Sequence, residues 1–298
     1  MAVLSLGILM TIVSWVVAWS RIPTLSEHSF FPLWLGYLLI LNGTSAVIFK
    51  DSLLQRMGWS FLLLFLLSIP FWWYFEMANL LVNNWHYEFH KPVSRFQFAI
   101  EASIDFSTVL PAVLSTIFLI YRLLEFTRVK LSSVPIPMSR RLLVLSVLAG
   151  GLSVMMLALI PAIAFPLVWI APILLLEPIM FAVGYPCVLR RIERGEWLFP
   201  AAIAIGTLFN GAWWELWNFY SLPKWVYTVP YVGFLKIFEM PLLGYFAYPF
   251  FGFVVYSYTE FALSGLLARE PLHELIASVR KSSRGEAVRI DFPRQRRR

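Results

Sequence analysis

The chain has 298 residues, of which 59% are hydrophobic and only 14% are charged, and its formal net charge is +7. Soluble domains carry about a quarter charged residues, so this composition excludes a soluble protein and predicts an integral membrane protein. The single cysteine, Cys187, excludes an intrachain disulfide and a cysteine-based metal site.

Continuous apolar runs, rather than alternating ones, recur along the chain and predict membrane-spanning helices. The first run has no basic segment before it and no clear cleavage site, so we expect it to be a retained span and not a signal peptide. We predict an all-α polytopic protein of about eight helices, near residues 3–20, 31–49, 59–82, 97–121, 142–163, 166–185, 198–220 and 240–267.

The basic residues are distributed unevenly among the loops. Of the 24 Lys and Arg residues, 19 fall in loops 50–56, 122–141 and 190–194 and in the tail from Arg269. Such residues favour the cytoplasmic side of a plasma or inner membrane, so both termini are predicted to be cytoplasmic. For the basic tail we expect contact with anionic membrane lipids and no nucleic-acid partner.

Two stretches of the sequence resemble each other, which predicts an internal duplication. FWWYFEMANLLVNNWHY at 71–87 matches GAWWELWNFYSLPKWVY at 211–227. Two more pairs follow the same order, Trp34 to Asn42 with Trp169 to Glu177, and Glu101 to Pro111 with Glu239 to Pro249. We therefore expect two like-oriented four-helix repeats, residues 1–135 and 136–268, followed by the tail 269–298.

Acidic residues inside apolar spans indicate a site, because a charged carboxylate in the bilayer costs roughly 2.5 kcal/mol or more. Asn79 and Asn218 each follow a glutamate by three residues, so each amide is expected to donate to that glutamate. Glu101 and Asp105 lie one turn apart and are expected to share a proton or bind a cation. The predicted catalytic residues are Glu76, Glu215, Glu101, Glu239 and Asp105.

Tryptophans surround these acids. Inward-facing indoles would line an apolar pocket whose π-faces stabilise a cation. The predicted substrate-binding residues are Asn79, Asn218, Trp73, Trp214, Trp217, Trp85 and Trp225. A structural alternative is that the Glu and Asn side chains are interhelical hydrogen bonders. No metal or other cofactor is predicted, although His86 and His90 leave a carboxylate and imidazole site open. Arg122 and Glu260 are expected to form a salt bridge near the cytoplasmic ends.

An all-helical membrane protein in two like-oriented repeats, with glutamates beside aromatics, resembles the membrane-embedded lycopene cyclases. The stretch FNGAWWELWNF resembles the helix that carries the catalytic acid of the integral-membrane terpene cyclases. The resemblance implies an enzyme that acts on a lipophilic, isoprenoid- or carotenoid-like substrate by carboxylate acid/base chemistry. The Pro-x-Glu-Glu signature of lycopene cyclases is absent. Two alternatives remain open: a proton-coupled transporter, and a non-catalytic subunit that binds lipid or pigment within a membrane complex.

Overall fold

The computed structural model describes residues 1–131, 133–267 and 269–277, and this part of the chain is mainly helical. Eight longer helices follow the predicted spans: α1 (Ala2–Ser20), α2 (Phe30–Phe49), α4 (Leu62–Val82), α6 (Val109–Phe126), α7 (Arg140–Leu159), α9 (Leu167–Val183), α11 (Leu198–Phe219) and α12 (Ala247–Glu260). The shorter helices are α3 (Leu53–Met57), α5 (Arg95–Phe106), α8 (Pro161–Ala164), α10 (Val188–Glu193) and α13 (Leu272–Ala277). Most of the predicted tail lies outside the described residues.

Five helical segments in the described part are long and apolar enough to cross a membrane: Ala2–Ser20, Phe30–Phe49, Leu53–Val82, Arg95–Phe126 and Arg140–Leu159. Their outer faces are apolar as well. On α7, for example, Leu148 and Leu159 are 63% and 70% exposed. A soluble protein rarely exposes so much contiguous apolar surface. The prediction of an integral membrane protein is therefore supported, and the full set of eight spans stays a prediction.

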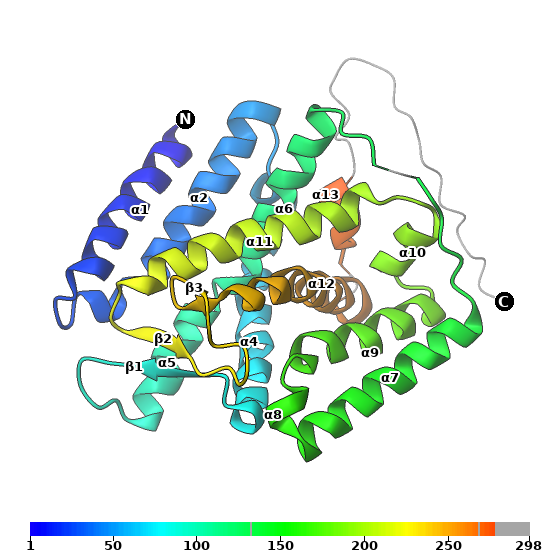
Figure 1. Ribbon diagram of the computed structural model, residues 1–298. Coiled ribbons are helices and arrows are strands. Elements are labelled where there is room, and N and C mark those ends of the chain that lie inside the picture. The colour runs from blue at the N-terminus through cyan, green and yellow to red at the C-terminus, as the bar shows by residue number, and fades with distance from the viewer. Residues whose placement is uncertain (132, 268, 278–298) are drawn as a thin grey trace.

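Helix pairs stand at the two edges of the molecule. In Figure 1, α1 and α2 lie side by side at one edge and α7 and α9 at the other, with α4, α6, α11 and α12 between them. Small residues allow the edge pairs to approach closely. A Cβ added at Gly7 would lie 2.7 Å from the backbone nitrogen of Ile40, and one added at Gly150 would lie 2.8 Å from Leu175.

The basic segments contact one another at one end of the bundle. The backbone N–H of Ile136 donates to the carbonyl of Ile192 (3.1 Å), so the 122–141 loop touches α10. The Arg56 guanidinium donates to the carbonyl oxygen of Leu275 (2.8 Å), which ties the 50–56 loop to α13. Each of these two contacts joins two of the basic segments, and the orientation of the termini stays a prediction.

The second helix of each edge pair, α2 and α9, makes a matching contact with the short helix that comes after it. The side-chain oxygen of Asn42 accepts the backbone N–H of Leu54 at the start of α3 (2.9 Å). Glu177 accepts the N–H of Leu189 at the start of α10 (2.9 Å). Both contacts occupy N–H groups that a helix start leaves unpaired. Asn42 and Glu177 occupy matching positions in the two predicted repeats, and each accepts a backbone N–H at the start of the next short helix.

The last predicted span begins later than expected. Residue 240 belongs to a short hairpin, β3 (Lys236–Ile237) and β4 (Met240–Pro241), which is followed by a 3₁₀ segment at Leu242–Phe246. Pro241 adopts an extended backbone and provides no N–H for a helix. Regular α-helix therefore begins only at Ala247, and Glu239 lies in a hairpin turn outside the helix.

Candidate active site

A two-stranded ribbon joins the two similar sequence segments. Strands β1 (Trp85–Glu88) and β2 (Lys224–Tyr227) pair antiparallel, with Trp85 opposite Tyr227 and Tyr87 opposite Trp225. The Trp-x-Tyr motif of one segment thus pairs in reverse with the same motif of the other. This pairing brings the ends of α4 and α11 to one place, although 139 residues separate Glu76 from Glu215 in the sequence.

Asn79 and Asn218 form hydrogen bonds with backbone groups at the tryptophan residues of this ribbon. Asn79 donates to the carbonyl of Trp85 (2.8 Å), and its side-chain oxygen accepts the N–H of Asn84 (2.8 Å). Asn218 donates to the carbonyl of Trp225 (2.8 Å) and accepts its N–H (2.9 Å). The amides therefore position the strands, whereas the spacing had predicted that they donate to the glutamates.

The two glutamates accept hydrogen bonds from aromatic side chains. Oε1 of Glu76 accepts from the Tyr87 hydroxyl (2.6 Å) and from the indole nitrogens of Trp72 (3.0 Å) and Trp85 (3.2 Å). Glu76 is half-buried. Its carboxylate therefore holds three aromatic rings in fixed orientations.

Glu215 holds two tyrosines in the same way. Its Oε1 accepts from the hydroxyls of Tyr227 (2.7 Å) and Tyr248 (2.6 Å). The residue is fully buried, and its Oε2 has no hydrogen-bond partner within the described residues. Burial, followed by the negative charge of the adjacent glutamate, keeps the pKa of both Tyr87 and Tyr227 well above the ordinary tyrosine value. Both hydroxyls therefore stay neutral and act as donors.

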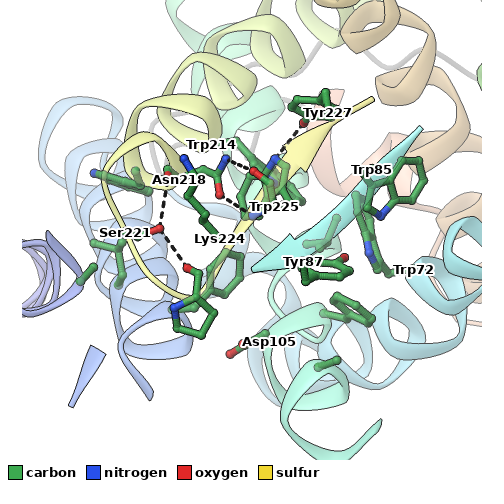
Figure 2. Close-up of a pocket in the computed structure, with 18 of the residues that line it drawn as sticks. Trp72, Trp85, Tyr87, Asp105, Trp214, Asn218, Ser221, Lys224, Trp225 and Tyr227 are labelled. Atoms are coloured by element: carbon green, nitrogen blue, oxygen red, sulfur yellow. Dashed lines mark hydrogen bonds between the residues drawn. The ribbon is translucent and has the colours of Figure 1, made fainter. Parts of the chain in front are cut away.

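A cavity of about 160 Å³ lies in front of these aromatic rings (Figure 2). Trp72 and Trp214 stack in its wall, with ring centroids 5.2 Å apart and planes 28° apart. The other aromatic rings of the wall are Trp85, Trp169, Trp217, Trp225, Tyr87, Tyr227, Tyr248, Phe30, Phe89, Phe98, Phe106 and Phe251. The walls therefore present mostly π-surface and a few polar groups, as small-molecule sites do.

Acidic groups enter this cavity from α5. Glu101 and Asp105 line it, whereas Glu76, Glu215 and Glu239 do not. Glu101 accepts from the Gln97 side chain (2.9 Å), and the backbone N–H of Phe31, in the first turn of α2, hydrogen-bonds Asp105. Figure 2 shows Asp105 on one side of the cavity and Asn218, Ser221 and Lys224 on another. Among the described residues, no lysine or arginine forms an ion pair with Glu101 or Asp105.

Lys224 is the basic residue of the cavity wall, and it forms an ion pair with Glu239. Glu239, which the sequence had predicted to be catalytic, is therefore paired with this lysine and does not line the cavity. The remaining acid of the wall, Glu27, lies 3.7 Å from Lys91. With these two pairs formed, Glu101 and Asp105 are the acidic side chains of the cavity wall that have no ion-pair partner among the described residues.

The predicted tryptophans have different positions. Trp85, Trp214, Trp217 and Trp225 line the cavity. Trp73 does not, because its indole nitrogen donates to the Ser103 hydroxyl (2.9 Å) on α5. The site also contains rings that the sequence-based prediction omitted, namely Trp72, Trp169, Tyr87, Tyr227 and Tyr248. The repeated Trp-x-Tyr motif was a signal for two of them, and no sequence pattern marked Tyr248.

The histidines near the site do not gather with acids. Nε2 of His90 lies 3.0 Å from the Ser26 hydroxyl, in the loop beside the cavity. In the described ranges, no three His, Cys, Asp or Glu side chains are grouped so that they could hold a metal ion. The polar groups of the site are carboxyl groups, tyrosine and serine hydroxyls, the Asn218 amide and one paired lysine.

No protein-family model, curated protein or solved structure matches this chain. The resemblance to membrane cyclases therefore stays a prediction, and functional inference depends on the geometry of the site.

Proposed function

We propose that the chain is a membrane-embedded enzyme that acts on a lipophilic, isoprenoid- or carotenoid-like substrate by acid/base chemistry, with the aromatic cavity as its active site. The observation that carries this proposal is the presence of two carboxyl groups, Glu101 and Asp105, in a cavity walled by tryptophan, tyrosine and phenylalanine rings, where no described residue forms an ion pair with them. Such a cavity suits an apolar molecule that becomes positively charged during the reaction.

The chemistry needs a proton donor, a stabilising surface and a proton acceptor. One carboxylic acid of the Glu101 and Asp105 pair gives its proton to a carbon–carbon double bond of the substrate, and a carbocation forms. The negative π-faces of Trp72 and Trp214 stabilise this cation. The carboxylate then takes a proton from a neighbouring carbon, and a new double bond forms. The net reaction is an isomerisation or a cyclisation and needs no cofactor.

In this proposal Glu76 and Glu215 are positioning residues. Each lies behind the aromatic wall and accepts hydrogen bonds from side chains whose rings line the cavity. This role replaces the catalytic role that the sequence alone had suggested for them. Their hydrogen bonds stiffen the wall, so the rings need not reorganise when charge develops in the cavity.

We further propose eight spans in two like-oriented repeats, 1–135 and 136–268, with both termini cytoplasmic. The support is local: the Asn42 and Glu177 contacts, the Asn79 and Asn218 contacts, and the reciprocal Trp-x-Tyr ribbon. The gathering of basic loops at the end away from the ribbon supports the orientation. The cavity then lies toward the non-cytoplasmic leaflet.

The test compares the isoprenoid and carotenoid profiles of cells that carry the gene, lack it, or carry Asp105→Asn or Glu101→Gln. We expect one lipid to accumulate and another to disappear both without the gene and with Asp105→Asn. Glu196→Gln is the matched control, because Glu196 lies outside the cavity and pairs with Arg191. An unchanged profile in all strains would contradict the enzymatic proposal, and loss of proton-linked uptake into vesicles would favour transport.

A further inference from the structure

A second hollow adjoins the cavity and differs from it in chemistry. It runs between Phe165, which follows α8, with Ile170 at the start of α9, and Phe250 at the beginning of α12. Leu243 and Phe246 form part of its wall and are 48% and 70% exposed on the apolar surface. We call this hollow the apolar groove. Its lining is almost entirely hydrocarbon, with Asn84 as its amide side chain, so it suits an apolar occupant.

The apolar groove adjoins the cavity. Six residues line both spaces, namely Trp85, Trp169, Tyr227, Met240, Gly244 and Ala247. A molecule that occupies the cavity therefore meets the groove across one shared wall. The carboxylates of α5 belong to the cavity alone, so the two spaces together have one polar end and one apolar end.

The shared wall has a rigid side and a flexible side. Trp169 stacks on Phe75, with centroids 4.9 Å apart and planes 20° apart, and both rings are held in the aromatic core. On the other side, the Met240 side chain lies over Gly244, where an added Cβ would be 2.3 Å from its sulfur. Methionine changes rotamer at low cost, so this side can adjust to a hydrocarbon chain that passes it. Gly244 has no side chain and therefore leaves space for the Met240 side chain to move.

We propose that the apolar groove receives the hydrocarbon tail of the molecule whose reacting end occupies the cavity. The ligand is then a single-chain lipid longer than the cavity, and Met240 and Gly244 set how much chain passes. This inference rests on the cavity being the binding site of the proposed function, and it adds the form of the substrate and the residues that select its length.

The test uses the full chain in lipid nanodiscs and two probes, octyl- and hexadecyltrimethylammonium, whose cationic heads suit the acidic aromatic cavity. Binding is measured by tryptophan fluorescence for the wild type and for Gly244→Val. For each probe, the dissociation constant of Gly244→Val is divided by that of the wild type, and this ratio removes the contribution of probe partitioning into the bilayer. We expect this ratio to be roughly tenfold larger for the hexadecyl probe than for the octyl probe, because the added side chain overpacks the wall that the longer chain must pass.

Two further variants distinguish a specific effect on the shared wall from a general folding defect. Ala247→Leu fills the same wall from the adjoining helix and should reproduce the effect. Gly151→Val makes the same change on α7, where an added Cβ meets no atom within 4 Å, and should leave both probes unaffected. A hexadecyl probe with a terminal diazirine should label peptides 165–170 and 243–250.

Equal ratios for both probes, or labelling confined to the lipid-facing sides of α1 and α7, would overturn the proposal. Labelling of the groove by bilayer acyl chains that the probe does not displace would also overturn it. The two proposals fail separately. An unchanged cellular lipid profile together with length-selective binding would contradict the enzymatic proposal and support the tail-binding role of the groove. A changed lipid profile with equal ratios for the two probes would support the enzymatic proposal and contradict the role of the groove.

Discussion

Tyr248 and Gly211 are in direct contact where α12 crosses α11: a Cβ added to Gly211 would lie 2.6 Å from the tyrosine ring. The same ring donates its hydroxyl to Glu215, one turn further along α11 (2.6 Å). The close crossing of two helices and the polar contact of the wall thus depend on one glycine. The missing side chain at residue 211 allows the tyrosine to reach the buried glutamate.

Gly211→Ala should therefore lower stability and disturb the cavity together. The added methyl must push the Tyr248 ring away, which costs about 1–3 kcal/mol for overpacking. We expect a lower unfolding temperature in detergent and weaker binding of the octyl probe. Gly151→Ala is the control, since it adds a methyl to a helix in open space. Equal unfolding temperatures for the two variants would show that the crossing has room to spare.

Replacements of Glu215 should show whether the protein needs its side chain as a hydrogen-bond acceptor or as an ionisable carboxyl group. Glu215→Gln keeps an oxygen that accepts from Tyr227 and Tyr248, whereas Glu215→Leu leaves two buried hydroxyls without it. An unsatisfied buried polar group costs about 1–3 kcal/mol. We expect the leucine variant to unfold at a clearly lower temperature than the glutamine variant, and the glutamine variant to keep its lipid product. A glutamine variant that folds normally but makes no product would instead give Glu215 a catalytic role.

Removal of either asparagine should loosen the ribbon. Asn79→Ala and Asn218→Ala each delete a side chain that binds the backbone on both its donor and acceptor sides. We expect a loss of about 1–3 kcal/mol each, larger at Asn218, which is only 2% exposed. Amide hydrogen exchange of residues 85–88 and 224–227 should rise in both variants. A rise confined to the strand beside the mutation would argue against the two strands acting as one unit.

Cys187 should be inert in the folded protein. It is buried, and this burial, together with nearby Glu177, raises the pKa of its thiol to about 12. The reactive thiolate is therefore scarce at neutral pH, and its fraction increases only as the pH approaches that value. We expect negligible maleimide labelling of the native protein and complete labelling after denaturation. Rapid native labelling would mean that the segment between α9 and α10 opens.

An inert native cysteine permits a direct test of orientation. Ser133→Cys places a thiol beside the basic loops, and Gly233→Cys places one beyond the ribbon; both positions are exposed. An impermeant maleimide added outside intact cells should label Gly233→Cys and spare Ser133→Cys. Inverted vesicles should give the opposite pattern. Labelling of both variants from the same side would contradict the proposed arrangement.

The salt bridge predicted between Arg122 and Glu260 does not form. Arg122 pairs with Glu125 three residues along its own helix (2.9 Å). Glu260 accepts the backbone N–H of His273 (2.8 Å) and the Tyr256 hydroxyl (3.1 Å). The two residues occupy equivalent positions in the aligned repeats, but Arg122 pairs within its own helix, and α13, which lies outside the aligned repeats, brings His273 to Glu260.

By itself the sequence determined the membrane class, the positions of most helices and the two matching segments, because apolar run length and charge distribution are local properties. It also identified the aromatic and acidic residues that gather at one end. Only the tertiary structure decided which acids reach the cavity. Glu76 and Glu215 lie on the predicted helices, yet aromatic donors that arrive from the ribbon and from α12 cover them. Asp105 faces the open space because α5 ends there. Spacing along one helix fixes the face of a side chain, but what that face meets depends on contacts between residues far apart in the chain.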